Sequence, residues 1–227
     1  MIPNWDNIPE ELKNDATREY YSLLKNKTCS LIAKRLFDII VSFIMIVVLS
    51  PILAIIAIII KVDSKGPAIY RQERVTQYGK VFRVCKFRTM VERADQIGTH
   101  VTVDGDPRIT RVGRKIRDCR LDELPQLFNV LTGTMSFVGT RPEAVKYVDA
   151  YTDEMKATLL LPAGITSKAS IMFKDEAELL AGEPDVDRAY IEKVLPEKMK
   201  YNLEYMKKFS FFEDIMLMIK TVLAVLG

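Results

Sequence analysis

The feature that most constrains this chain is an apolar segment from Ile39 to Ile60, in which only Ser42, Ser50 and Pro51 are not plainly apolar. By length and hydropathy the segment can form a helix that crosses a bilayer, so it must meet lipid. A signal peptide is a poor match, because the apolar run begins late and continues into Lys61 without a small-residue cleavage site.

Pro51 interrupts this segment at its middle. A proline has no backbone N–H and clashes with the carbonyl group four residues before it, so the sequence predicts a helix break at Ser50-Pro51. The hydroxyl of Ser50 can satisfy a backbone group that the proline frees. Each arm of about 11 residues would be about 16 Å long, close to one leaflet of a hydrocarbon core of about 30 Å.

Positive residues flank the apolar segment on both sides, with Lys34 and Arg35 before it and Lys61 and Lys65 after it. Such flanks give no preferred orientation for a span. They favour a re-entrant helix-break-helix hairpin with both ends in the cytoplasm. An ordinary kinked transmembrane anchor is the alternative.

Composition excludes several classes of protein. The 227 residues are 48% hydrophobic, enough for one compact domain with an appendage. The three cysteines form no CxxC pair, and His100 is the only histidine. A disulfide scaffold, a structural zinc site and a histidine-based mechanism are therefore not expected, and a reducing cytoplasm is the default.

Positive charge is concentrated in one stretch. Residues 71–120 contain 13 lysines and arginines against 6 acidic residues, although the whole chain has a net charge of only +3. A local excess of this size attracts polyanions such as nucleic acid, anionic lipid headgroups or nucleotide phosphates. A solvated charged face is the plain alternative. The adjoining membrane segment shifts the interpretation to membrane lipids or a phosphorylated substrate, with no nucleic acid partner.

The chain divides into three predicted parts: a peripheral N-terminal helical segment over 1–33, the membrane helix over 34–62, and a cytoplasmic or interfacial catalytic domain over 63–227. The third part contains a predicted β-hairpin, 69–75 and 81–88, joined through Tyr78-Gly79 and placing Lys86 and Arg88 on one face. Predicted helices follow at 112–119, 143–160, 175–180, 187–209 and 211–226. The fold class is therefore α+β, mostly helical with a short β-hairpin: a compact cytoplasmic domain with a re-entrant membrane hairpin and interfacial amphipathic helices.

Two adjacent carboxylates, Asp122 and Glu123, begin another predicted helix. Leu124, Leu127, Phe128 and Leu131 have the spacing of one buried helical face, and Pro125 suits a first turn. Asp122 is then placed as the N-cap, where free N–H groups stabilise its ionised form.

An aspartate at an N-cap is usually only a cap, but its neighbours favour chemistry. Glu123 adds a second carboxylate, and Mg²⁺ is bound by a few carboxylates together with substrate phosphates. Five arginines lie just before the pair: Arg108, Arg111, Arg114, Arg117 and Arg120. Such a pair can serve as a metal clamp, with Asp122 and Glu123 as ligands, or as a carboxylate nucleophile on phosphorus.

Other nucleotide motifs give little. The chain has no P-loop, and no GxGxxG sequence opens a helix. Asp104-Gly105-Asp106 matches the short DxD pattern by which many glycosyltransferases hold a metal, but a three-residue pattern recurs by chance.

Seven segments in a fixed order resemble one family, the monotopic phosphoglycosyl transferases, also called bacterial sugar transferases. The resemblance runs from about Lys34 to the C-terminus. Its segments are Lys34-Arg35-Leu36-Phe37-Asp38, Ser50-Pro51, Ser64-Lys65-Gly66-Pro67, Lys86-Phe87-Arg88-Thr89-Met90, Gly105-Asp106-Pro107-Arg108-Ile109-Thr110, Leu121-Asp122-Glu123-Leu124-Pro125-Gln126-Leu127 with Asn129-Val130-Leu131, and Met135-Ser136-Phe137-Val138-Gly139.

The resemblance implies an enzyme that moves a sugar-1-phosphate from a UDP-sugar to polyprenol (undecaprenyl) phosphate, the first membrane step of bacterial glycoconjugate assembly. Asp122 would form a covalent phosphosugar-aspartate, and Glu123 would bind Mg²⁺ and assist proton transfer. Lys86, Arg117 and Arg141 are carried over as phosphate ligands. Arg88 and Arg108 complete the candidate substrate-binding set.

The implied location is the cytoplasmic face of the bacterial inner membrane, with the protein monotopic and a homo-oligomer compatible with the sequence. Thr140, where the family usually has a proline, leaves the shape of the loop around Arg141 open. Two other functions compete: a conventional glycosyltransferase that uses Asp104 and Asp106, and a non-catalytic scaffold whose basic face binds anionic lipid.

Overall fold

A computed structural model describes residues 2–91, 94, 106–173, 179–180 and 183–226. The α-helices are α1 (Asp15–Lys25), α2 (Thr28–Asp63), α3 (Arg111–Asp118), α4 (Gln126–Thr132), α5 (Val145–Val148), α6 (Lys168–Met172), α8 (Val186–Ala189), α9 (Leu195–Lys208) and α10 (Phe211–Leu226). The strands are β1 (Ile69–Val75), β2 (Val81–Phe87), β3 (Met135–Val138) and β4 (Ala163–Thr166). Short 3-10 turns lie at Trp5–Asn7, Glu10–Leu12, Gln77–Gly79, Leu121–Glu123 and Met155–Leu160, and a π-turn at Tyr190–Val194 joins α8 to α9.

The fold is mostly helical with small sheets, as the sequence predicts. The hairpin is confirmed: β1 and β2 pair antiparallel, with Tyr70 opposite Lys86, and positive φ angles at Tyr78 and Gly79 make the turn. β3 and β4 form a second, parallel pair that the sequence analysis missed. The single helix predicted over 143–160 is wrong, because this stretch contains only α5 and a 3-10 turn. The predicted helix over 175–180 lies mostly outside the described residues.

The main hydrophobic core joins the two ends of the chain. Tyr20 and Leu24 of α1 are buried in the same cluster as Tyr190, Met199 and Phe209 near the C-terminus. Tyr20 also donates a hydrogen bond to Glu154, 2.7 Å away. Residues 1–33 therefore supply part of the core of the domain.

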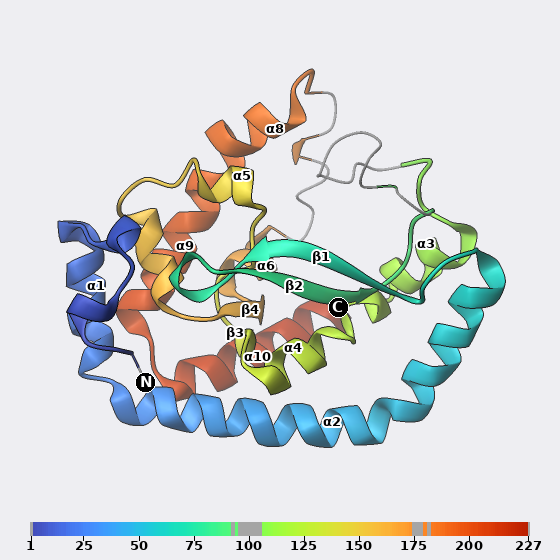
Figure 1. Cartoon of the computed structure of the whole chain (residues 1–227), viewed down its shortest axis with the longest axis horizontal. Helices are drawn as coiled ribbons and strands as arrows, with labels where there is room; N and C mark the ends of the chain where they lie inside the picture. Colours follow the sequence, from blue (N-terminus) through green and yellow to red (C-terminus); the bar gives the residue numbers. More distant parts are fainter. Residues whose placement is uncertain (1, 92–93, 95–105, 174–178, 181–182, 227) are drawn as a thin grey trace.

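Helix α2 begins at Thr28 and continues through Pro51 to Asp63, so the predicted break at Ser50-Pro51 is a bend within one helix. Figure 1 shows the helix running beneath the domain and changing direction in its second half. Pro51 cannot donate to the carbonyl of Val47, and the Ser50 hydroxyl donates to that carbonyl instead, at 2.8 Å. The predicted role of Ser50 is confirmed.

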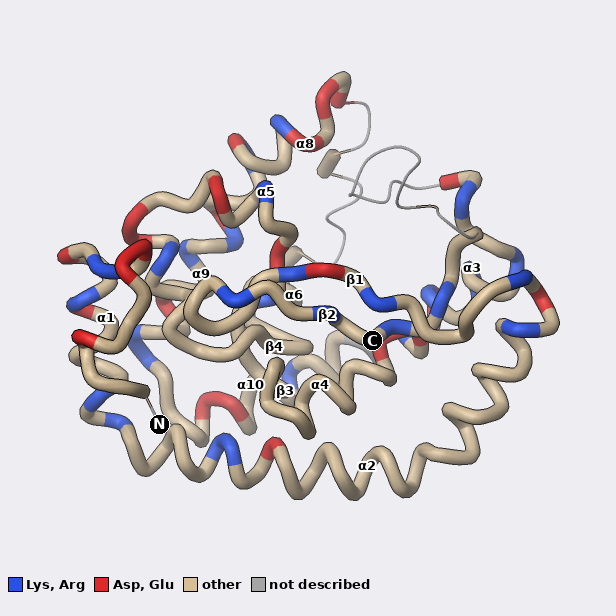
Figure 2. The backbone as a smooth tube through the Cα atoms, viewed as in Figure 1, with Lys and Arg blue, Asp and Glu red and all other residues tan. Residues whose placement is uncertain are grey.

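The middle of α2 presents apolar side chains that the domain leaves uncovered. Phe43 is 58% exposed, Val48 67% and Ile58 63%. Figure 2 shows charged residues at both ends of the helix and none along its middle. By length and composition α2 is long and apolar enough to cross a membrane, which fits a membrane-associated helix.

A polar strip near the start of α2 attaches this helix to the domain. Lys34 forms a buried ion pair with Asp214 of α10 at 2.7 Å and donates to the carbonyl of Val138 in β3. Arg35 donates to the carbonyls of Val130 and Leu131 at the end of α4. The Asp38 carboxylate accepts from the Phe137 N–H, at 3.2 Å. The lipid-facing helix is thus fixed to β3, α4 and α10 at once.

Replacing Lys34 by methionine leaves the Asp214 carboxylate buried without its cation. We expect a loss of roughly 3–5 kcal/mol in the free energy of unfolding, measured by chemical denaturation in detergent. Lys61→Met is the matched control, because Lys61 is an exposed lysine of the same helix. Equal losses in the two variants would contradict the assigned role of Lys34.

Candidate active site

Asp122 and Glu123 lie in a 3-10 turn between α3 and α4, not at the cap of an α-helix. Arg120 has a left-handed backbone conformation with φ 56°, which reverses the chain after α3. Because Pro125 has no N–H, the carbonyl of Leu121 accepts instead from the Leu124 N–H in a tight 3-10 bond of 3.3 Å. The α-helix therefore starts only at Gln126, and the predicted N-cap at Asp122 is wrong.

The predicted buried face of α4 also needs correction. Leu127 is 2% exposed, but Phe128 is 45% exposed. Asn129 is buried instead, where its side-chain amide donates to the carbonyl of Arg83 and accepts from the N–H of Cys85. Asn129 thereby ties α4 to β2, the strand that carries Lys86. The sequence analysis gave Asn129 no role.

Glu123 is surrounded by cations from distant parts of the chain. Arg141 Nη2 lies 2.7 Å from Glu123 Oε1, and Lys86 Nζ lies 3.8 Å from the same oxygen. Burial opposes ionisation of Glu123, but the charges of Arg141 and Lys86 outweigh it and lower the pKa of Glu123 to about 2. Glu123 is therefore a fixed negative charge at neutral pH.

Asp122, the next residue, is shifted in the opposite direction. Burial raises the pKa of Asp122, and the negative charge of Glu123 raises it further, while Lys86 and Arg117 partly oppose them. Burial disfavours the charged form of Lys86 too, and therefore lowers its pKa, to about 8. Two neighbouring carboxylates pushed apart in pKa are typical of groups with different roles in one reaction.

The loop that carries Arg141 is held by backbone hydrogen bonds to β4 and to β1. The Gly164 N–H donates to the carbonyl of Thr140 at 2.9 Å, and the Val75 N–H donates to the carbonyl of Glu143 at 3.0 Å. Gly139 and Gly164 pack so closely that a Cβ on Gly164 would lie 2.1 Å from the Gly139 nitrogen. The loop thus has a defined shape with threonine at position 140.

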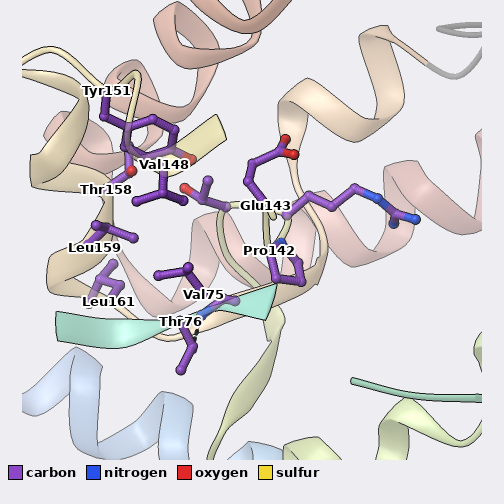
Figure 3. Close-up of a pocket in the computed structure, with 12 residues that line it drawn as sticks. Val75, Thr76, Pro142, Glu143, Val148, Tyr151, Thr158, Leu159 and Leu161 are labelled. Atoms are coloured by element: carbon purple, nitrogen blue, oxygen red, sulfur yellow. Dashed lines mark hydrogen bonds between the residues drawn. The ribbon is translucent and has the colours of Figure 1, made fainter. Parts of the chain in front are cut away.

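Beside this loop lies a small cavity with room for about one water molecule, about 10 Å³. Figure 3 shows Pro142, Glu143 and Tyr151 along its walls. The Glu143 side chain accepts from the buried Tyr190 hydroxyl at 2.6 Å and pairs with buried Lys198 at 3.2 Å. The cavity is too small for a substrate, and the buried contacts of Glu143 hold the loop in place.

The structure brings together five of the seven predicted site residues and gives Arg88 and Arg108 other partners. β2 ends at Phe87, so the predicted shared face of Lys86 and Arg88 is wrong. Arg88 turns to the end of α2 and donates to the Ser64 carbonyl at 2.6 Å.

Arg108 forms a bidentate ion pair with Asp106, in which Arg108 Nη2 lies 2.6 Å from Asp106 Oδ2 and Arg108 Nε lies 2.9 Å from Oδ1. Asp106 is 3% exposed, and the Arg108 side chain holds its pKa below the usual range. The Asp106 carboxylate is thus paired with Arg108, which disfavours a role for Asp106 as a metal ligand in a DxD motif. Asp104 lies outside the described residues.

The donor set fits a hard divalent cation. The carboxylates of Asp122 and Glu123 are the oxygen donors at this site. Mg²⁺ is commonly held by one or two carboxylates plus substrate phosphates and water. No cluster of three or more His, Cys, Asp or Glu side chains occurs among the described residues, so a site formed by protein ligands alone is not indicated there.

The sequence profile of the family described as bacterial sugar transferase matches residues 29–227. The chain belongs to this family. The match covers α2 from its second residue and all later elements, including the turn that carries Asp122 and Glu123.

Three similar proteins have names that describe transfer of a sugar phosphate to undecaprenyl phosphate. The chain is 36% identical over 196 residues to the UDP-N-acetylgalactosamine-undecaprenyl-phosphate N-acetylgalactosaminephosphotransferase of Aeromonas hydrophila, an alignment that covers 85% of this chain and 43% of the relative. It is 38% identical over 193 residues to the UDP-glucose:undecaprenyl-phosphate glucose-1-phosphate transferase of Escherichia coli strain K12, covering 83% of this chain and 39% of the relative. A Bacillus subtilis protein, a putative undecaprenyl-phosphate N-acetylgalactosaminyl 1-phosphate transferase, is 43% identical over 133 residues, covering 58% and 74%. The chain thus spans about two fifths of the length of the first two relatives.

Proposed function

We propose that this chain is a phosphoglycosyl transferase that moves a sugar-1-phosphate from a UDP-sugar to polyprenol phosphate. The observation that carries the proposal is the Asp122–Glu123 pair, with opposite pKa shifts and three cations around it, in a domain attached to an apolar helix. The family and the names of its relatives supply the substrate classes. The product would begin a bacterial polysaccharide or glycoconjugate at the cytoplasmic face of the membrane.

The first step is attack by an Asp122 oxygen on the β-phosphorus of the donor. A bond forms between phosphorus and the aspartate oxygen. The bond to the bridging oxygen breaks, and uridine monophosphate (UMP) leaves with that oxygen and the electron pair. In the second step a phosphate oxygen of the acceptor attacks the same phosphorus and expels the Asp122 carboxylate. The raised pKa of Asp122 suits this role, because a more basic carboxylate is a better nucleophile.

Lys86, Arg117 and Arg141 face the donor's phosphates in this proposal. Their positive charges oppose the repulsion between an anionic nucleophile and an anionic substrate. Glu123 keeps Lys86 and Arg141 in place through its ion pairs, at 3.8 Å and 2.7 Å. Bound at Asp122 and Glu123, Mg²⁺ would further offset the phosphate charge.

For α2 we propose a re-entrant hairpin that enters one leaflet and returns. The bend at Pro51 and the charges at both helix ends support this topology. The protein would then be monotopic, with its active site at the membrane surface.

Incubation of the protein with a competent UDP-sugar and no acceptor should give a covalent phosphosugar adduct on Asp122, detected by intact-protein mass spectrometry. Asp122→Asn should form no adduct and lose turnover by several orders of magnitude. Asp118→Asn is the matched control, because Asp118 is exposed at the end of α3. A competent donor that yields no adduct would argue against the covalent step. UDP as the nucleotide product in place of UMP would instead support a conventional glycosyltransferase.

The kcat/KM for the donor should fall at both low and high pH. On the acid side Asp122 becomes protonated, at a pH above the usual aspartate range because its pKa is raised. On the basic side Lys86 loses its proton as the pH rises through about 8. Lys86→Arg keeps its charge at high pH and should remove the basic limb. A basic limb unchanged in Lys86→Arg would contradict the assignment to Lys86.

The two exposed cysteines test the topology, because Cys29 begins α2 and Cys119 follows α3. In single-cysteine variants, a membrane-impermeant maleimide should label both from the cytoplasmic side and neither from the outside. Labelling of Cys29 from the opposite side would show a spanning helix and overturn the re-entrant proposal.

A further inference from the structure

The β1–β2 hairpin has one face turned to the domain and one to solvent. Strand alternation and the register place Tyr70, Gln72 and Arg74 on the same face as Lys86. These side chains are partly buried, as is Phe82 opposite Arg74, and Val84 is fully buried. The charged residues of the other face, Arg71, Glu73 and Arg83, are exposed. Lys86 and Arg74 are therefore the two inward-facing cations of the hairpin.

Arg74 differs from Lys86 in having no close ion pair with a carboxylate of the described residues. Lys86 pairs with Glu123, whereas no carboxylate of the described residues lies within ion-pair distance of Arg74. Arg74 Nη1 donates a hydrogen bond to the adjacent backbone carbonyl of Glu73, at 3.0 Å. A partly buried guanidinium without a carboxylate costs free energy, and such groups are found where an anionic ligand supplies the missing charge.

Electrostatic coupling connects Arg74 to the site. Burial lowers the pKa of Arg74. The negative charge of Glu143 raises this pKa, and the positive charge of Arg141 lowers it further. The charges of Arg141 and Arg74 both lower the pKa of Lys86. Arg74, Lys86 and Arg141 thus form one group of positive charges, in which Glu123 pairs with Lys86 and Arg141 and the Glu143 carboxylate acts on Arg74.

Position along the strand indicates which part of the donor Arg74 would meet. Lys86 lies opposite Tyr70, beside the carboxylates, and Arg74 is four residues further along β1, about 13 Å at about 3.3 Å per residue. Arg74 therefore lies further along the hairpin from Asp122 and Glu123 than Lys86 does. Of the two groups attached to the phosphorus that Asp122 attacks, the leaving nucleotide gains negative charge as its bond breaks, whereas the sugar does not.

We propose that Arg74 binds the phosphate of the leaving nucleoside monophosphate and stabilises its charge during the first half of the reaction. This inference rests on the proposed function and adds a residue that the sequence analysis did not consider. It assigns Arg74 to the donor half-reaction alone, because the nucleotide has left before the acceptor attacks.

The test compares the two half-reactions in Arg74→Gln. In a double-displacement reaction, kcat/KM for the donor reports the first half and kcat/KM for the acceptor the second. We expect the donor value to fall roughly 10- to 100-fold, the loss of a charge-assisted hydrogen bond, with the acceptor value unchanged. Arg83→Gln, on the solvent face of the same hairpin, should change neither. An equal fall in both values would indicate a structural role and overturn the proposal.

Binding of UMP without turnover, measured by calorimetry, separates this inference from the proposed function. Wild type and Arg83→Gln should bind UMP equally, Arg74→Gln roughly 10- to 100-fold more weakly, and Arg74→Lys with intermediate affinity, since it keeps the charge but loses the planar fork. Equal UMP binding by wild type and Arg74→Gln would overturn the role of Arg74 alone. No UMP binding by wild type would count against the proposed function itself.

Discussion

The buried ion pair between Lys34 of α2 and Asp214 of α10 is the interaction on which the arrangement of the molecule depends. Burying two charges costs desolvation, so such a pair is better understood as fixing a geometry than as a source of stability. Here it sets the position of a lipid-facing helix against a water-facing domain. Arg35, the next residue, holds the last carbonyls of α4, the helix that follows the carboxylates. Neighbouring residues of one helix thereby fix the position of the carboxylate pair relative to the apolar helix α2.

A few neighbouring residues also position the carboxylate pair. A left-handed residue at Arg120 and a proline at 125 leave room for a single 3-10 turn between two helices, and this turn presents Asp122 and Glu123 together. Adjacent side chains in so tight a turn point in different directions. Glu123 therefore meets Lys86 and Arg141, while Asp122 keeps a less compensated charge. Backbone geometry, rather than residue type, divides the roles of the two acids.

Local signals in the sequence were enough to predict several elements and to single out the carboxylate pair. The period-2 pattern of the hairpin, the apolar run with Pro51 and the acidic doublet all predicted features that the structure contains. Contacts between distant segments were beyond reach. Arg88 carries the same charge as Lys86 two residues earlier, yet the strand ends between them and Arg88 turns to the end of α2. A linear sequence shows that cations are available but not which of them converge.

Bringing several cations close together costs free energy, and this cost indicates a site for an anionic ligand. Burial lowers the pKa of Lys86 to about 8 although Glu123 lies 3.8 Å away, and burial also lowers the pKa of Arg74, which has no close ion pair among the described residues. Partial burial of these cations keeps the positive potential of the site high, so phosphates that enter meet groups already in position. The lowered pKa values of these cations and the affinity for a diphosphate that we propose are two consequences of the same charge arrangement.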